Sequence, residues 1–283
     1  MANYDDLVRS MKIPKMMKIE QVFDRPVIND VENAVREQLK RKGTLDRIKK
    51  GMNVAITAGS RGIRDIARVI KCICDEVKKK GATPFVIPAM GSHGGSTAEG
   101  QLDILRLLGI TEEYIQVPIR ATMEVIELGK TKSGITAMFD KYAFEADATI
   151  VVNRIKAHPA FKHKVESGIA KMVVIGLGKQ KGAAQCHSTA VHKLGPYIEE
   201  VADYVLSHSN IVFGVGILEN AYDETFKIVA IPSEKILEEE PSYLLEAKQY
   251  SAKIYLKDYD VLIIDEIGKN ISGAGVDTTI IER

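Results

Sequence analysis

The histidines of this chain are gathered in segments that could carry acid–base chemistry. Five of the six lie between positions 158 and 208, and the sixth, His93, stands in the glycine-rich stretch MGSHGGSTAEG. A histidine on a glycine-rich loop leaves room for a ligand beside the backbone, and imidazole exchanges protons near neutral pH. We therefore predict a catalytic or ligand-binding role for His93. Ser96 or Thr97 is expected to cap the following helix, with Glu99 in its first turn.

A second segment, RIKAHPAFKHK, places four basic residues and two histidines within eleven positions, from Arg154 to Lys164. This concentration of positive charge predicts contact with an anion. His158 is the better candidate for chemistry because Pro159 stiffens the backbone beside it. His163 is the alternative, and its position between two lysines is typical of a solvated side chain.

Lys171 stands directly before the apolar run Met172–Gly176, which we expect to be a buried strand. Apolar surroundings disfavour the ammonium form of a lysine and make its amine a nucleophile. The alternative is a lysine whose stem packs while its amine reaches solvent. The glycine-lysine loop 177–183 could bind phosphate, but it lacks the full spacing of a P-loop. His187 and His192 are five positions apart, which excludes a pair of zinc ligands on one helical face, so at most one is a ligand.

The stretch AGSRG follows the expected strand Asn53–Thr57 and contains Ser60 and Arg61. Arg61 could bind a carboxylate or phosphate through two N–H groups, beside the N-terminus of the next helix. The alternative is that Ser60 caps this helix and Arg61 is solvated.

The elements that must position these residues follow an α/β pattern. Short β-branched runs alternate with helical patterns, which predicts a Rossmann-like, mostly parallel sheet with helices on both faces. Loops with functional residues then follow the carboxyl ends of the strands. The clearest helix is Arg64–Lys80, with Gly81 after its end and one apolar stripe, formed by Ile66, Val69, Ile70, Ile73 and Val77. The expected strands are Asn53–Thr57, Thr83–Pro88, Ala148–Asn153, Met172–Gly176, Ile211–Leu218 and Val261–Asp265.

The composition restricts the classes of protein to which this chain could belong. The chain has 283 residues, 45% hydrophobic and 27% charged, with a net charge of +1, which gives no basic field for nucleic acid. No apolar run approaches the roughly 20 residues of a membrane span, and the N-terminus lacks a secretory signal. We expect a cytoplasmic protein without nucleic-acid or membrane partners. Cys72, Cys74 and Cys186 are expected to be reduced thiols that serve packing.

Taken in order, the motifs MGSHGGSTAEGQ, VVNRIKAHPAF, ESGIAKMVVIGLGKQKGA, CH and DEIGKNISGAG resemble the lactate racemase-like proteins that use a nickel-pincer nucleotide. The resemblance covers nearly the whole chain. It implies that His93 and His158 are paired acid/bases, that Lys171 tethers the cofactor, and that His187, sixteen residues further on, coordinates nickel.

The same resemblance assigns the remaining site residues and the domains. Ser60 and Ser167 would contact the cofactor, and Arg61 and Lys269 would bind the substrate carboxylate. Residues 1–257 are expected to form the N-terminal domain, with its core at 18–210, and residues 258–283 to be the start of a truncated C-terminal domain.

The implied activity is racemisation or epimerisation of a 2-hydroxy acid. A histidine removes the hydroxyl proton while the C2 hydrogen leaves as hydride to the pyridinium ring, and its return to the opposite face inverts the centre. Ala58 stands where the family has an aspartate, which suggests a different 2-hydroxy acid from lactate. Cofactor-synthesis enzymes are expected as transient partners. The alternatives are a nucleotide-dependent oxidoreductase or phosphotransferase, without the G-x-G-x-x-G fingerprint, and a non-catalytic anion-binding or metal-binding fragment.

Overall fold

The computed structural model describes residues 9, 11–12, 15–268, 271–272 and 275–281. Its centre is a five-stranded sheet in the order β2-β1-β5-β6-β7. The first four strands of this order are parallel, and β7 pairs antiparallel with β6. The strands of the sheet are β1 (Asn53–Ala58), β2 (Thr83–Pro88), β5 (Ala148–Arg154), β6 (Ile211–Glu219) and β7 (Thr225–Pro232), and a separate hairpin contains β3 (Val125–Lys130) and β4 (Thr136–Asp140).

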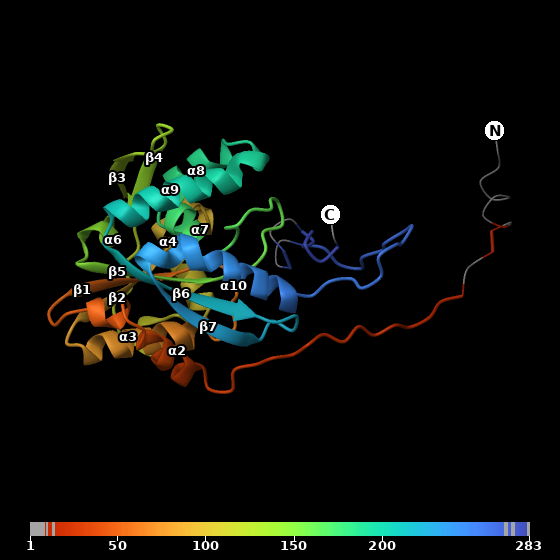
Figure 1. The fold of residues 1–283 in the computed structure, drawn as a ribbon, viewed down its shortest axis with the longest axis horizontal. Coiled ribbons are helices and arrows are strands. Elements are labelled where there is room, and N and C mark those ends of the chain that lie inside the picture. The colour runs from red at the N-terminus through yellow and green to blue at the C-terminus, as the bar shows by residue number, and fades with distance from the viewer. Residues whose placement is uncertain (1–8, 10, 13–14, 269–270, 273–274, 282–283) are drawn as a thin grey trace.

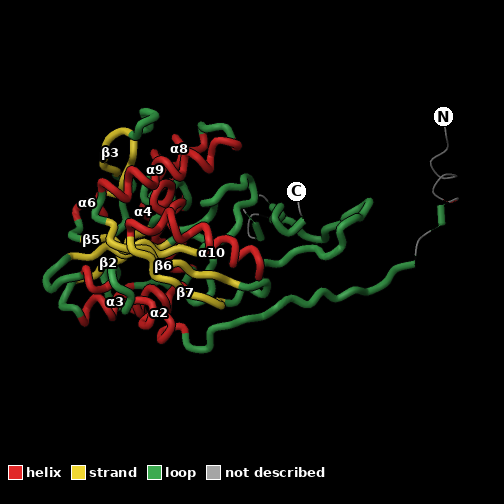
Figure 2. The backbone as a smooth tube through the Cα atoms, viewed as in Figure 1, coloured by secondary structure: helices red, strands yellow, loops and turns green. Residues whose placement is uncertain are grey.

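Helices cover both faces of the sheet, with α2 and α3 on one face and α9 and α10 on the other (Figure 1). The tube in Figure 2 shows the same layered order, helix over strand over helix. The α-helices are α2 (Val31–Leu39), α3 (Ile66–Lys79), α4 (Ala98–Leu107), α5 (Glu112–Ile115), α6 (Lys141–Glu145), α7 (Ile169–Lys171), α8 (Lys179–His187), α9 (Leu194–His208) and α10 (Ile236–Tyr250). The short helical turns are η1 (Leu45–Arg47), η2 (Gly94–Ser96), η3 (Met172–Gly176), η4 (Val191–Lys193) and η5 (Ser233–Lys235).

Successive residues of β5 point to opposite faces of the sheet, and both faces are buried. Val151 belongs to the core on the α9 and α10 side, whereas Ile150 and Val152 belong to the core on the α3 side. This is why the central strands are nearly continuous apolar runs, as the sequence indicated. The predicted α/β fold with a mostly parallel sheet is confirmed.

The helix expected at Arg64–Lys80 is confirmed as α3, Ile66–Lys79. All five residues of its predicted apolar stripe are buried. The helix stops where predicted, since Gly81 has a φ of +74°, which favours glycine.

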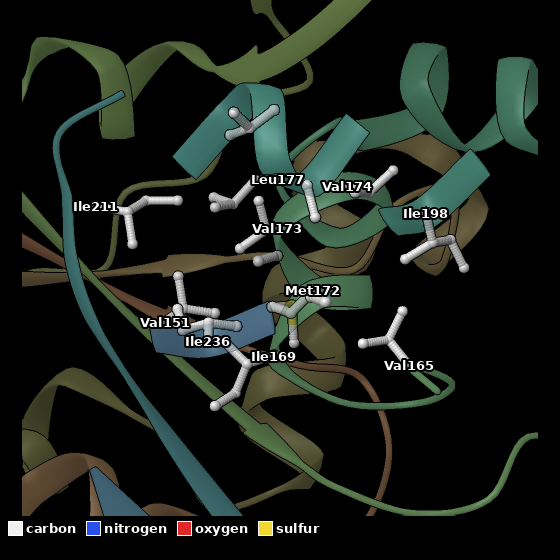
Figure 3. Packing of buried hydrophobic residues seen from close by; sticks show 14 of the residues in the cluster. Val151, Val165, Ile169, Met172, Val173, Val174, Leu177, Ile198, Ile211 and Ile236 are labelled. Carbon is white, nitrogen blue, oxygen red and sulfur yellow. The ribbon is translucent and has the colours of Figure 1, made fainter. Parts of the chain in front are cut away.

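The strand expected at Met172–Gly176 is wrong. These residues form a π-helical turn that continues α7, and Met172, Val173 and Val174 are buried in the core over the sheet. Figure 3 shows their side chains among those of β5, α9 and α10. A helix that is buried on all sides has the same continuous apolar sequence as a buried strand, so the pattern alone does not separate the two.

The strand expected at Val261–Asp265 is also wrong, because the segment pairs with no strand in the described structure. Its four apolar residues are exposed. A strand is stabilised by hydrogen bonds to a neighbour, which this segment lacks here. Conversely, β3, β4 and β7 were not predicted, although Asn220 and Asp223 marked the turn between β6 and β7.

The N-terminal segment contacts the stretch that follows α10, and the C-terminal segment then returns toward the end of β5, where Asp277 pairs with Lys156 (3.4 Å). Gln21 accepts a hydrogen bond from the backbone N–H of Tyr255 (2.8 Å) and donates to the carbonyl of Lys253 (3.2 Å). Phe23 stacks on Tyr255 with 5.2 Å between the ring centroids. Of the helices within the described residues, none has the length and apolarity that crossing a membrane requires.

Candidate active site

Three loops that follow neighbouring parallel strands meet at the carboxyl edge of the sheet. β1 leads to Ser60 and Arg61, β2 leads to His93, and β5 leads to His158. The chain moves from β1 to β2 on one side and later adds β5 on the other, so the direction of strand addition reverses at β1. Ligands of open α/β sheets bind at such a position.

His93 is held through both its ring and its backbone. Its Nδ1 lies 2.5 Å from the hydroxyl oxygen of Ser60, a residue that does not cap α3. The buried amide of Gln101 donates to the carbonyls of Gly91 (3.0 Å) and His93 (3.3 Å). Thr97 caps α4, as predicted, by accepting a hydrogen bond from the backbone N–H of the third helical residue. Ser60 therefore holds the imidazole, and Gln101 holds the backbone that carries it.

Of the two glycines that follow His93, Gly94 is the one needed for backbone packing. Gly94 has a φ of +68°, and a Cβ there would come within 2.5 Å of the Gly100 backbone. At Gly95, by contrast, a Cβ would meet open space. The glycine-rich sequence thus reflects a loop folded against α4 as well as room for a ligand.

The His158 loop is stiffened by neighbours on three sides. The ring Nδ1 accepts a hydrogen bond from the backbone N–H of Ala160 (3.1 Å), and the ring lies 4.4 Å from that of Phe161. The backbone N–H of His158 donates to the buried carboxylate of Glu166 (2.7 Å). Because Nδ1 is an acceptor, neutral His158 carries its proton on Nε2.

Lys171 is the last residue of the short helix α7, and its side chain is half-buried. Burial lowers the pKa of its amine from 10.5 to about 8, and the positive charges of Arg61 and Lys156 act in the same direction. The predicted desolvated lysine is present, although a helix and not a strand carries it. At pH near 8 about half of the amine is in the nucleophilic neutral form.

The electrostatic environment of the two histidines shows that the candidate residues converge. Burial lowers the pKa of His93, and the charges of Arg61, Lys171 and His187 lower it further. Burial also lowers the pKa of His158, to about 3; the charges of Lys171, Lys156 and His187 lower it further, and the charge of Asp277 opposes them. Lys171 and His187, at the end of α8, therefore influence both histidines. The structure brings His93, His158, Lys171, His187 and Arg61 into one electropositive site, as an anionic ligand requires.

Other candidates have different positions. His163 lies against α9, where its ring would collide with a Cβ at Gly195, and its Nε2 is 3.6 Å from a carboxylate oxygen of Glu199. Ser167 pairs through its backbone with Lys156. Lys269, expected to bind substrate, lies outside the described residues.

The glycine-lysine loop after η3 is not a phosphate cradle. Lys179 is fully buried and forms an ion pair with Asp140, so its amine is unavailable to a ligand in the site. Close to Arg61, the backbone N–H of Arg64 already has an acceptor within the chain, because it donates to the carboxylate of Glu219 (2.6 Å).

The residues of this site could bind a metal ion only together with an organic group that supplies further metal donors. Within the described ranges, no three His, Cys, Asp or Glu side chains form a group that could hold a metal ion. His187 offers a single imidazole, so the other donors must come from a ligand. Lys171, an amine of lowered pKa in the same site, is a suitable point of attachment for one. This combination fits a covalently attached organic group that supplies the remaining metal donors itself.

A family model described as the lactate racemase N-terminal domain matches residues 5–195. The chain belongs to this family. The lactate racemase apoprotein from Thermoanaerobacterium thermosaccharolyticum is similar in structure, with a TM-score of 0.58 and 15% sequence identity. The match covers 75% of this chain and 54% of that chain, so this lactate racemase-family chain spans about half the length of the apoprotein. A search of curated proteins finds no match.

The membership confirms the family that the motifs resembled, and the structural likeness confirms the fold. The residues that support the site through hydrogen bonds to its backbone were not predicted from the sequence. They are chiefly Glu166, Gln101 and Glu240. A buried glutamate that accepts hydrogen bonds from distant backbone N–H groups has no local sequence signature. Its partners become visible only when the chain is folded.

Proposed function

We propose that this lactate racemase-family domain acts in the racemisation or epimerisation of a 2-hydroxy acid. The observation that carries the proposal is the convergence of His93, His158, Lys171 and His187, in which the lysine and His187 act electrostatically on both other histidines. The family membership supports an isomerase of the racemase type.

In this proposal, Lys171 holds a nickel-pincer nucleotide through its amine, and His187 binds the nickel. Ser60 and Ser167 contact the same group. When bound, the nucleotide supplies a pyridinium carbon that accepts and returns a hydride. The basic side chains around the bound nucleotide keep the site positively charged, which favours an anionic substrate.

The chain's own residues perform the proton transfers. His93 and His158, on separate loops, exchange the hydroxyl proton of the two enantiomers. Arg61 binds the carboxylate through paired N–H groups, and Lys269 assists it. A bound carboxylate would offset the positive charges beside His158 and raise its pKa toward the range of a useful base.

The proposal extends to location and partners. We propose a cytoplasmic protein whose partners are a small 2-hydroxy acid and, transiently, the enzymes that make the cofactor. Residues 1–257 would form the N-terminal domain and residues 258–283 would begin the C-terminal domain.

The test combines mass and activity. The chain is produced together with cofactor-making enzymes, and intact mass and nickel content are measured. We expect about one nickel per chain and a mass adduct that maps to Lys171 and is lost in Lys171→Arg. Absence of both adduct and nickel in the unsubstituted chain would refute the proposal that Lys171 and His187 hold a nickel-pincer nucleotide.

Activity is then measured as interconversion of enantiomers across a panel of 2-hydroxy and aldonic acids. His93→Gln and His158→Gln should each lower the rate by about 10² or more, the typical contribution of a general acid or base. His192→Gln, at an exposed histidine of η4, is the matched control and should remain active. Normal rates in both site variants would refute the assigned roles.

A further inference from the structure

The turn that carries Lys171 is held by a carboxylate from a helix far away in the sequence. The backbone N–H of Ala170 donates to Oε2 of Glu240 on α10 (2.9 Å), and the N–H of Ile169 is a second donor to the same carboxyl group. Glu240 lies 70 residues from Ala170 and is 1% exposed. The first N–H groups of α7 thus have a side-chain acceptor that α7 itself does not supply.

The sequence around Gly168 is shaped to admit this carboxyl group. A Cβ at Gly168 would collide with Oε1 of Glu240, so any other residue there would displace it. The carbonyl of Gly168 accepts a hydrogen bond from the side chain of Asn153, at the end of β5 (2.7 Å). The turn before Lys171 is therefore held on one side by the sheet and on the other by α10.

Glu240 has no cationic partner within the described residues. Burial raises its pKa to about 7, and the two backbone N–H groups oppose this rise. Burial of a carboxyl group without a cation is unfavourable unless its hydrogen bonds are met. An apolar side chain would fill the same space but would leave the N–H groups of Ala170 and Ile169 without an acceptor, which indicates that the carboxyl group serves to hold this turn.

We propose that Glu240 is a positioning residue for Lys171: by fixing the first turn of α7, it keeps the amine in the desolvated site and out of bulk solvent. The role of this lysine rests on the proposed function, but its position does not. Glu240 lies outside residues 5–195, the part that the family model matches. α10 also reaches the His158 loop, since Lys248, two turns further along, forms an ion pair with Glu166 (2.7 Å).

The experiment measures the reactivity of the Lys171 amine in the full chain without cofactor. Trace acetic anhydride is applied from pH 6 to 11, and acetylation is read by peptide mass spectrometry, normalised to the exposed Lys132. The groups that act on the amine are Cys186, Arg61 and Lys156, and none of them is altered. In the unsubstituted chain, we expect labelling of Lys171 with a midpoint near pH 8.

Glu240→Leu removes both acceptors and keeps an apolar volume. We expect the midpoint for Lys171 to rise by one unit or more toward 10.5, so that labelling at pH 7, below both midpoints, falls about tenfold for each unit. Glu240→Gln keeps one acceptor and should give a smaller shift. Glu238→Leu, at an exposed position of the same helix, is the matched control and should give none.

A folded Glu240→Leu variant, judged by circular dichroism, with an unshifted Lys171 midpoint would overturn the inference. If that variant does not fold, Gly168→Ala, which displaces the carboxyl group, is measured in the same way. A raised Lys171 midpoint in Gly168→Ala supports the inference, and an unshifted midpoint overturns it. Because no cofactor is involved, a shifted midpoint together with a chain that never gains nickel would refute the proposed function and leave this inference standing.

Discussion

Lys179 and Asp140 form an ion pair in which Nζ lies 3.0 Å from Oδ2, and neither side chain is more than 1% exposed. Lys179 has a φ of +53°, unusual for a residue with a side chain, and its amine also donates to the carbonyl of Pro88 and to Gln101. Since Gln101 holds the backbone of His93, the ion pair connects α8 with the His93 loop. The conformational cost at Lys179 is compensated by these buried contacts.

Replacing one partner of this ion pair should be strongly destabilising. Lys179→Met leaves the Asp140 carboxyl group buried without a cation, and we expect a loss of about 3–5 kcal/mol in the free energy of unfolding, measured in urea. The double variant Lys179→Met/Asp140→Asn should lose less than the sum of the single variants. Arg106→Ala, which breaks an exposed pair with Asp103, should have little effect. Additive losses in the double variant would contradict the pairing.

His158 should remain neutral down to acidic pH. Its pKa in the folded chain is about 3, below the ordinary 6.5, so the unfolded chain binds a proton that the folded chain does not between these values. Its contribution to stability is therefore complete above pH 6.5 and declines as the pH falls toward 3. We expect the stability of His158→Gln to depend less on pH between 6.5 and 4.5 than that of the unsubstituted chain.

Nitrogen NMR tests the same residue directly. Because Nδ1 accepts from the Ala160 N–H, the spectrum should show His158 as the tautomer protonated at Nε2 throughout this range. A protonated Nδ1, or a titration near pH 6.5, would be inconsistent with the described loop.

Glu166 should control the mobility of the His158 loop. Its carboxylate accepts from the backbone N–H groups of His158 (2.7 Å) and His163 (3.1 Å). Glu166→Gln places an amide donor against one of these donors, and we expect hydrogen exchange at the two amides to accelerate about tenfold or more, equivalent to roughly 1–3 kcal/mol. Lys248→Met, which removes only the cation, should have a smaller effect. Unchanged protection in Glu166→Gln would exclude this role.

Alanine at Gly168 should be destabilising because of contact and not because of backbone conformation. The φ of Gly168 is −169°, which any residue adopts, whereas a Cβ there would collide with the Glu240 carboxyl group. We expect a loss of about 1–3 kcal/mol on thermal or urea unfolding. Gly62→Ala is the matched control, since a Cβ at that position would have no atom within 4 Å. In a Glu240→Ala background the cost of Gly168→Ala should largely disappear, and its persistence there would point to another cause.

The sequence by itself determined the elements whose pattern is local. The apolar stripe and terminal glycine of α3 predicted that helix, and continuous apolar runs predicted β1, β2, β5 and β6. It also singled out His93 and His158, because unusual residue types followed strands whose carboxyl ends share one edge. Lys171 and His187 depended on the resemblance to a family, since isolated lysines and histidines have no distinctive local pattern.

Only the tertiary structure decided which of these residues act on one another and what holds them. Met172–Gly176 became helical because helices above the sheet surround it, a condition that the apolar run does not encode. The roles of Glu166, Lys179 and Glu240 depend on partners 3 to 91 residues away in the chain. The lowered pKa of Lys171 likewise comes from burial, which exists only once the sheet, α7 and α10 have packed together.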